Sequence, residues 1–180
     1  MTMNGSAIPT KTPPFDDALV DQLVEMREGR TFECKRVVGE KLTRALESIV
    51  AFANTEGGLL VLGLEDEDKA TGRDRVYGIQ ESPSAVDELQ RLIDSRITPP
   101  LDKPSFMEIG CTLRDGSWGS LVVVRVEKSE AIHSIVLNGT WQRLNKGNKE
   151  LVAEVETSGQ LFSAVQGKQS KERVQPVVIS

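Results

Sequence analysis

Three acidic residues, Glu28, Glu33 and Asp66, have the types and the spacing of a site for a divalent cation. Glu28 and Glu33 precede and enter a predicted strand at 31–37, and Asp66 follows an unbroken apolar run at 59–62. If the two strands are neighbours, the three carboxylates converge, and Mg²⁺ and Mn²⁺ prefer oxygen ligands of this kind. Such an ion activates water and stabilises charge on a phosphate. The alternative is that the three acids are solvated, as most acidic side chains are.

Lys35 adds a cation to this acidic set. It lies two residues after Glu33, and alternate residues of a strand share a face, so we expect both side chains on the same side. In a catalytic site of this kind, Lys35 would stabilise the charge of the transition state. Because neighbouring strand residues point to opposite faces, we expect only one of Lys35 and Arg36 to join any given patch.

A set of basic and aromatic residues suits contact with nucleic acid. Lysine and arginine bind backbone phosphates, and an indole ring stacks on a base. The alternative for the later members is an ordinary hairpin with solvated lysines and a partly buried tryptophan. The candidates for contact with nucleic acid are Lys35, Arg44, Trp141, Arg143, Lys146 and Lys149.

A helix predicted at 40–54 is the clearest element that positions these residues. Its apolar residues recur at intervals of three and four, which places them in one strip on the helix surface. Asn54 and the pair Gly57-Gly58 end it, because they tolerate a positive φ. The apolar run that follows predicts a buried strand at 59–64.

The remaining pattern mixes helices with strands that are paired in hairpins. Helices are predicted from Asp16 or Asp17 to about Glu28, from 82 to 97, and over 149–165. Turns at Asp115-Gly116 and Asn138-Gly139 each join two predicted strands, and a short strand is expected at 76–79. The strands lie at 105–114, 120–128, 131–137 and 140–144. This order predicts an α+β fold with a mixed or antiparallel sheet and packed helices.

Composition limits the function classes. The net charge is −5, so binding to nucleic acid would depend on a local basic patch and not on the charge of the whole chain. No apolar run approaches the ~20 residues that span a bilayer, and the first 14 residues do not resemble a secretory signal. With two cysteines, Cys34 and Cys111, a disulfide framework is not expected, and a reducing cytoplasm is the predicted location.

Three features that often mark catalytic sites have simpler interpretations here. Gly57-Gly58 follows a helix and lacks the P-loop pattern, so we expect no ATP site in this chain. His133 is the only histidine, and we expect a structural role for it. Both cysteines lie in strand patterns and are interpreted as packing residues, not nucleophiles.

Several motifs together resemble the Schlafen-type Alba-like domain family over about residues 18–155. Cys34 departs from the family pattern, where phenylalanine is usual. The motifs are Glu28-x-x-x-x-Glu33-Cys34-Lys35, Phe52-Ala-Asn-Thr-Glu-Gly-Gly58, Val76-Tyr-Gly-Ile79, Ile97-x-Pro-Pro100 and Trp141-Gln-Arg-Leu-Asn-Lys-Gly147.

This resemblance implies a Schlafen Alba-like fold and two alternative functions. The first is a DNA- or RNA-binding domain of a bacterial transcription regulator, which acts as a homodimer and is followed by a downstream domain. The second is a metal-dependent endoribonuclease that cuts structured RNA such as tRNA, with Mg²⁺ or Mn²⁺ held by Glu28, Glu33 and Asp66. The acidic loop is Glu65–Asp68, and Glu65 or Asp68 takes the place of Asp66 if another residue of this loop aligns with the family's aspartate. The expected division is a flexible tail at 1–17, the domain at 18–158, and a helix end and linker at 159–180.

Overall fold

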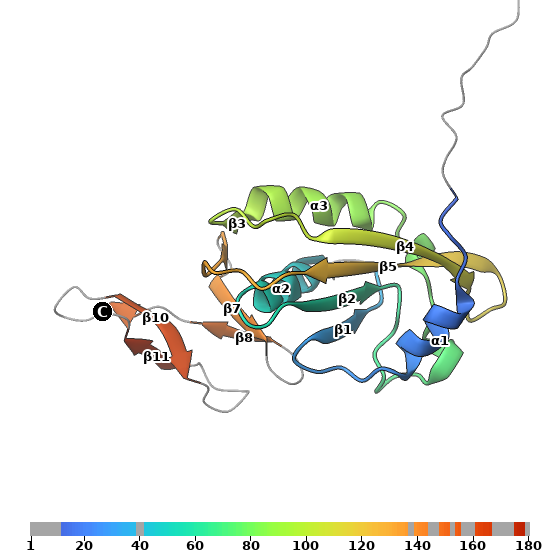
Figure 1. Cartoon of the computed structure of the whole chain (residues 1–180), viewed down its shortest axis with the longest axis horizontal. Helices are drawn as coiled ribbons and strands as arrows, with labels where there is room; N and C mark the ends of the chain where they lie inside the picture. Colours follow the sequence, from blue (N-terminus) through green and yellow to red (C-terminus); the bar gives the residue numbers. More distant parts are fainter. Residues whose placement is uncertain are drawn as a thin grey trace, which may run out of the picture.

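The computed structural model describes residues 12–38 and 42–136 in full, and beyond them the backbone of five short strands between 139 and 178 (Figure 1). Its central sheet has the order β1-β2-β5-β4. β1 and β2 are parallel, and the other two pairs are antiparallel, so the predicted mixed sheet is confirmed. The strand bounds are Phe32–Lys35 (β1), Gly58–Leu62 (β2), Ser105–Thr112 (β4) and Trp118–Val126 (β5).

Alternation along the strands divides the buried side chains between the two faces of the sheet. Helix α1, Asp17–Glu25, covers the face that carries Phe32, Cys34 and Val61. Helices α2, Leu42–Ala53, and α3, Ala85–Arg96, cover the opposite face, where Leu60 and Val124 pack. The prediction that the 59–64 and 121–127 strands share a sheet beneath the central helix is confirmed, because Leu60 pairs directly with Val124.

Helix α2 is enclosed on more than one side. Its apolar strip packs on the central sheet, and its last turn, Ala51, Phe52 and Ala53, is fully buried as well. A second sheet with the order β3-β6-β7-β8 lies beside it, and β7 contacts α2. The strand bounds are Ile97–Thr98 (β3), Ser134–Ile135 (β6), Gly139–Arg143 (β7) and Asn148–Leu151 (β8).

The predicted helix at 149–165 is wrong. This segment instead contains the end of β8, all of β9 and most of β10. The apolar positions there are too scattered to define a helical strip, and strand pairing satisfies the backbone groups instead. The third sheet has the order β11-β10-β9, with the bounds Glu154–Val155 (β9), Leu161–Gln166 (β10) and Gln175–Val178 (β11).

Three smaller expectations also need correction. Helix α1 ends at Glu25 because Met26 is already extended, so Glu28 lies in the following loop. The segment at 76–79 makes only one isolated bridge, between Val76 and Leu64, and it lies between the 3-10 helices η2, Gly72–Arg75, and η3, Ile79–Glu81. Helix α3 begins at Ala85 and not at 82, because Ser82 accepts the N–H of Ala85 in a turn that precedes it.

Within the described part of the chain, none of the helices is both long and apolar enough to cross a membrane.

Candidate functional site

Glu33 and Lys35 lie on the face of β1 that is turned toward α2, since Phe32 and Cys34 pack on the α1 side. Lys35 Nζ donates a hydrogen bond to Glu33 Oε1 at 3.1 Å. The Glu33 side chain is 7% exposed and that of Lys35 is 17% exposed, so the pair is largely shielded from water. The prediction that the two side chains share one side of the strand is confirmed.

Glu28 binds the backbone of the same strand. The carbonyls of Thr31 and Lys35 accept N–H groups from the β2 side. Successive residues of a strand direct their backbone groups to opposite sides, so the N–H of Cys34 points to the free edge of β1. Glu28 Oε1 accepts that N–H at 3.1 Å. The carboxylate therefore caps a backbone donor at the edge of the sheet.

Asp66 organises the loop after β2. Its Oδ1 accepts the N–H of Asp68 at 2.9 Å, and its carbonyl accepts the N–H of Lys69 at 3.0 Å. Its own N–H donates to Glu65 Oε1 at 2.9 Å. These bonds close the acidic loop into a compact turn.

The predicted metal ligands do not gather around one point. Among the residues that the structure describes, which include Glu28, Glu33 and Asp66, no group of three acidic, histidine or cysteine side chains is placed to hold a metal ion. Each of the three carboxylates accepts a hydrogen bond from the protein instead. The described geometry gives the metal site no support, and the site stays a prediction.

A basic pocket forms instead where the end of β1, the first turn of α2 and the acidic loop meet. Its volume is about 100 Å³. The cations Lys35 and Arg44, both predicted to contact nucleic acid, line it together. Arg36 lines the same pocket, so the expectation that only one of Lys35 and Arg36 joins a patch is wrong. Strand alternation stops at Lys35, where β1 ends. The complete lining is Cys34, Lys35, Arg36, Arg44, Glu65, Asp66 and Lys69.

Arg36 is held in a fixed orientation by a network around it. Its Nε and Nη2 donate to the two carboxylate oxygens of Glu81 at 2.9 and 2.7 Å, and its Nη1 lies 3.5 Å from Glu65 Oε2. The guanidinium carbon lies 3.6 Å from the centroid of the Tyr77 ring. Gly63, at φ +95°, accepts the N–H of Tyr77, and this close approach brings the ring under Arg36. The hydrogen bonds with Glu81 raise the pKa of Arg36.

Arg44 differs from the other cations of the pocket. Lys35 pairs with Glu33, Arg36 pairs with Glu81, and Lys69 lies 4.0 Å from Glu65. Arg44 is exposed and forms no ion pair with any residue that the structure describes.

Sequence reasoning considered Arg36 but did not select it for the nucleic-acid contacts, and it missed Lys69 as a pocket residue. Arg36 could have been found from its position directly after Lys35, at the end of the strand. Lys69 could have been found because it directly follows the acidic residues after β2. Four predicted contacts cannot be placed. The side chains of Trp141, Arg143 and Lys149, in β7 and β8, lie outside the described residues, as does Lys146.

The cysteines and the histidine are structural, as predicted. Burial raises the pKa of the Cys34 thiol to about 12, although Arg75 opposes the shift, and burial raises that of Cys111 to about 11. Neither thiol is a nucleophile near neutral pH. His133 is 2% exposed, and its ring nitrogens bond to the Pro99 carbonyl and the Ser129 hydroxyl.

Comparison with known proteins gives one match to a family. The model of the Schlafen AlbA_2 family matches residues 28–152, which span β1 to the end of the β7–β8 hairpin. No curated protein matches the chain.

Two solved structures resemble the chain only distantly. The DIP2311 protein from Corynebacterium diphtheriae is 17% identical, with a TM-score of 0.48, and the match covers 68% of this chain but only 25% of that protein. The N-terminal domain of a RecG-related protein from Nitrosomonas europaea is 22% identical, with a TM-score of 0.46. That match covers 76% of this chain and 92% of the domain. The chain thus spans about a quarter of the first neighbour.

Proposed function

The chain belongs to the Schlafen AlbA_2 family, and on that premise we propose that it is a nucleic-acid-binding domain of a bacterial regulator. The basic pocket between β1, α2 and the acidic loop receives a backbone phosphate of DNA or RNA. The observation that carries this proposal is the meeting of Lys35, Arg36 and Arg44 from two separate elements in one pocket of about 100 Å³.

The chemistry of these cations supports phosphate binding. Arg44 supplies a planar guanidinium that forms no ion pair with a described residue, and its shape suits two phosphate oxygens at once. Lys35 supplies a compact charge that the ion pair with Glu33 holds in place. Because this pair orders the Lys35 side chain before a ligand arrives, little of its side-chain entropy is lost on binding.

Charge also explains why the contact must be local. Glu65 and Asp66 line the pocket, and the protein as a whole carries a net charge of −5. Non-specific attraction of a polyanion is therefore weak, and each direct contact between a cation and a phosphate has a larger share in the affinity.

The β7–β8 hairpin extends this proposed surface. β7 and β8 contact α2, the helix that carries Arg44, and Arg143 and Lys149 belong to these two strands. We include Trp141, Arg143, Lys146 and Lys149 in the proposed contact set, with phosphates bound by the cations and a base stacked on the indole.

The wider setting is part of the same proposal. Each copy contributes one such basic pocket in its described part, so we propose that a duplex is bound by two copies, as a homodimer in the cytoplasm. A downstream domain would connect binding to regulation. The ribonuclease alternative has no specific observation in its favour, because the three acids hold backbone and lysine donors and do not surround a common point.

Fluorescence anisotropy with labelled single-stranded and duplex DNA and RNA tests the proposal. We expect Arg44→Ala to weaken binding by roughly three- to tenfold for each ligand that binds. Arg125→Ala is the matched control, since Arg125 is exposed on β5 and pairs only with Glu127 among the described residues. Equal losses from both substitutions, or no binding by the wild type, would reject the pocket as the contact.

A further inference from the structure

One edge of the central sheet carries both the basic pocket and the turn between β4 and β5. β1 and β2 are parallel, β5 runs against them, and β4 runs against β5. The ends of β1, β2 and β4 and the start of β5 therefore meet at the same edge (Figure 1). The basic pocket lies at the end of β1, and the β4–β5 turn, residues 113–117, lies farther along this edge.

The ring of Tyr77 joins the basic pocket to the β4–β5 turn. The guanidinium carbon of Arg36, which lines the pocket, lies 3.6 Å from the ring centroid, and that of Arg114, in the turn, lies 4.5 Å from it. The backbone N–H of Arg114 also donates to the carbonyl of Val76 at 2.8 Å. Two arginines thus contact one aromatic ring, and the turn adds a cation next to the pocket.

Arg114 is placed to bind an anion. Its side chain is exposed, and its Nε donates to the carbonyl of Asp74 at 3.1 Å. Together with the Tyr77 contact, this bond orients the guanidinium before a ligand arrives, which lowers the entropy cost of binding. The neighbouring acid, Asp115, accepts the N–H and the hydroxyl of Ser117 at 2.9 and 2.5 Å, so its carboxylate is held within the turn.

Trp118 follows the turn as the first residue of β5, and it is 52% exposed. Its backbone pairs with Thr112, which fixes it at the same edge of the sheet as Arg114. Single exposed apolar residues are common on protein surfaces. Here, however, an exposed indole lies four residues after an oriented arginine, and these are the two groups that bind a base and a phosphate.

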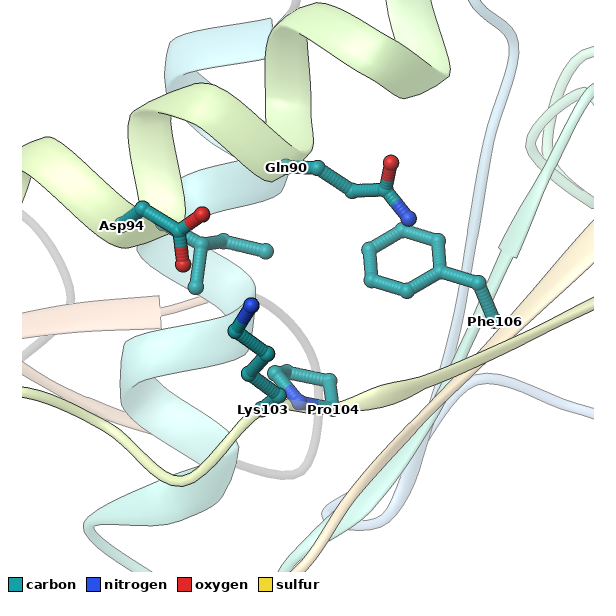
Figure 2. A pocket seen from close by; sticks show the side chains of 6 residues that line it. Gln90, Asp94, Lys103, Pro104 and Phe106 are labelled. Carbon is teal, nitrogen blue, oxygen red and sulfur yellow. The ribbon is translucent and has the colours of Figure 1, made fainter.

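The hollow at the opposite end of β4 has a different character. It has a volume of about 200 Å³ and lies between α3 and the start of β4. Figure 2 shows Lys103 and Asp94 pointing toward each other, so opposite charges face across the hollow. Phe106, the aromatic residue of its lining, is partly buried against the core. Balanced charges beside a partly buried ring do not suit a polyanion.

We propose that Arg114 and Trp118 form a second contact for nucleic acid and that this contact binds an unpaired segment. Arg114 binds a backbone phosphate, and the Trp118 indole stacks on the base beside it. In a duplex each base is already stacked between its neighbours, so an unpaired base is the one that reaches the indole. The ligand is therefore DNA or RNA in which a single-stranded stretch continues from the phosphate in the basic pocket. The inference rests on the proposed function and adds the class of ligand to it.

Fluorescence anisotropy with the full chain and three labelled ligands tests the inference, in DNA and in RNA. The ligands are a single strand, the same strand fully paired, and a duplex with an overhang of about eight nucleotides, a usual site size for single-strand binding. We expect Trp118→Ala and Arg114→Ala each to weaken binding of the single strand and the overhang ligand by at least about fivefold. Trp118→Ala should change binding of the fully paired duplex by less than about twofold.

Two matched controls come from the same hairpin. Met107→Ala removes a side chain of similar exposure, 51%, and Arg125→Ala removes an exposed cation. Both positions lie toward the end of the hairpin that is away from the β4–β5 turn. Each control should change the affinity for every ligand by less than about twofold.

Intrinsic fluorescence gives a second readout of base stacking. The chain has two tryptophans, so in a Trp141→Phe protein the signal comes from Trp118 alone. If a base stacks on this indole, the overhang ligand quenches the fluorescence in a saturable way, and the fully paired duplex does not.

The inference and the proposed function fail in different ways. A loss no larger than that of the matched control, an equal loss from Trp118→Ala for paired and overhang ligands, or saturable binding without quenching would overturn the inference. In each of these cases Arg44→Ala would still weaken binding, and the basic pocket would stand. No binding of any ligand by the wild type would reject the proposed function and this inference with it.

Discussion

Lys35 Nζ lies 3.1 Å from Glu33 Oε1, two positions apart on one face of β1. The pair gives Glu33 a role that needs no metal, because it holds the lysine at the basic pocket. We predict that Glu33→Gln, which keeps the size and removes the charge, tightens binding of nucleic acid by up to about fivefold, since a charge that competes with phosphate is lost.

Anisotropy measurements with and without EDTA check this prediction, and Glu67→Gln in the acidic loop serves as the control for charge alone. The ribonuclease alternative predicts instead that Glu33 and a bound metal ion are both needed for activity. Cleavage of tRNA in Mn²⁺ by the wild type, lost in Glu33→Gln and in EDTA, would show that Glu33 serves catalysis.

A second prediction concerns the β7–β8 hairpin. Arg143→Ala combined with Lys146→Ala removes two cations of the proposed surface, so binding should weaken and depend less steeply on salt. Binding isotherms at several salt concentrations check it, with Arg125→Ala combined with Lys128→Ala as a control of equal charge. An unchanged affinity and slope would remove the hairpin from the interface.

The third prediction is a pH dependence of stability. Burial raises the pKa of Asp17, but hydrogen bonds from Thr112 and the charge of Arg73 outweigh it, so the pKa lies below its ordinary value of 3.8. The stabilisation is therefore complete above pH 3.8 and is lost as the pH falls through the lower folded value.

We expect Asp17→Asn to lower the free energy of unfolding at pH 7 by about 1–2 kcal/mol, and the difference from wild type to shrink below pH 3.8. Urea unfolding at pH 7 and pH 3 measures it. Asp21→Asn is the control, because Asp21 is 64% exposed and its carboxylate pairs, among the described residues, only with Arg73. A difference that stays constant with pH would show that the carboxylate charge is not involved.

A fourth prediction concerns a buried cation that joins α1 to the acidic loop. Arg75 is 2% exposed and donates to the carbonyls of Val24 and Glu65 at 2.8 Å each. Arg75→Met leaves both carbonyls without these donors and should destabilise the fold by roughly 2–4 kcal/mol. Thermal unfolding measures this, with the exposed Arg91→Met as the control, and a cost no larger than that of the control would contradict it.

The central part of the fold was predictable because its signals are local and strong. The apolar strip of α2, the run Leu59–Leu62 within β2 and the turn at Asp115-Gly116 each follow from residue type and spacing. The same reasoning placed Glu33 and Lys35 on one face. The strands at 148–166 were missed because scattered apolar residues do not distinguish a strand from a helix.

The geometry of the site was less predictable, since it depends on contacts between distant segments. Spacing alone did not show that Glu28 binds the Cys34 N–H, which follows from the position of β1 at the edge of the sheet. Arg36 joined the pocket because β1 ends one residue before it, and strand ends are among the least certain features of a sequence.

The most direct test of the basic pocket is the salt dependence of binding to duplex DNA or structured RNA, measured for wild type and for Lys35→Ala combined with Arg44→Ala. If both cations contact phosphates, the plot of log Kd against log salt concentration becomes shallower by about 1 to 2 units of slope in the double variant. Arg125→Ala combined with Lys128→Ala carries the same change in net charge and should keep the wild-type slope. Equal slopes for all three proteins would contradict phosphate binding at this pocket.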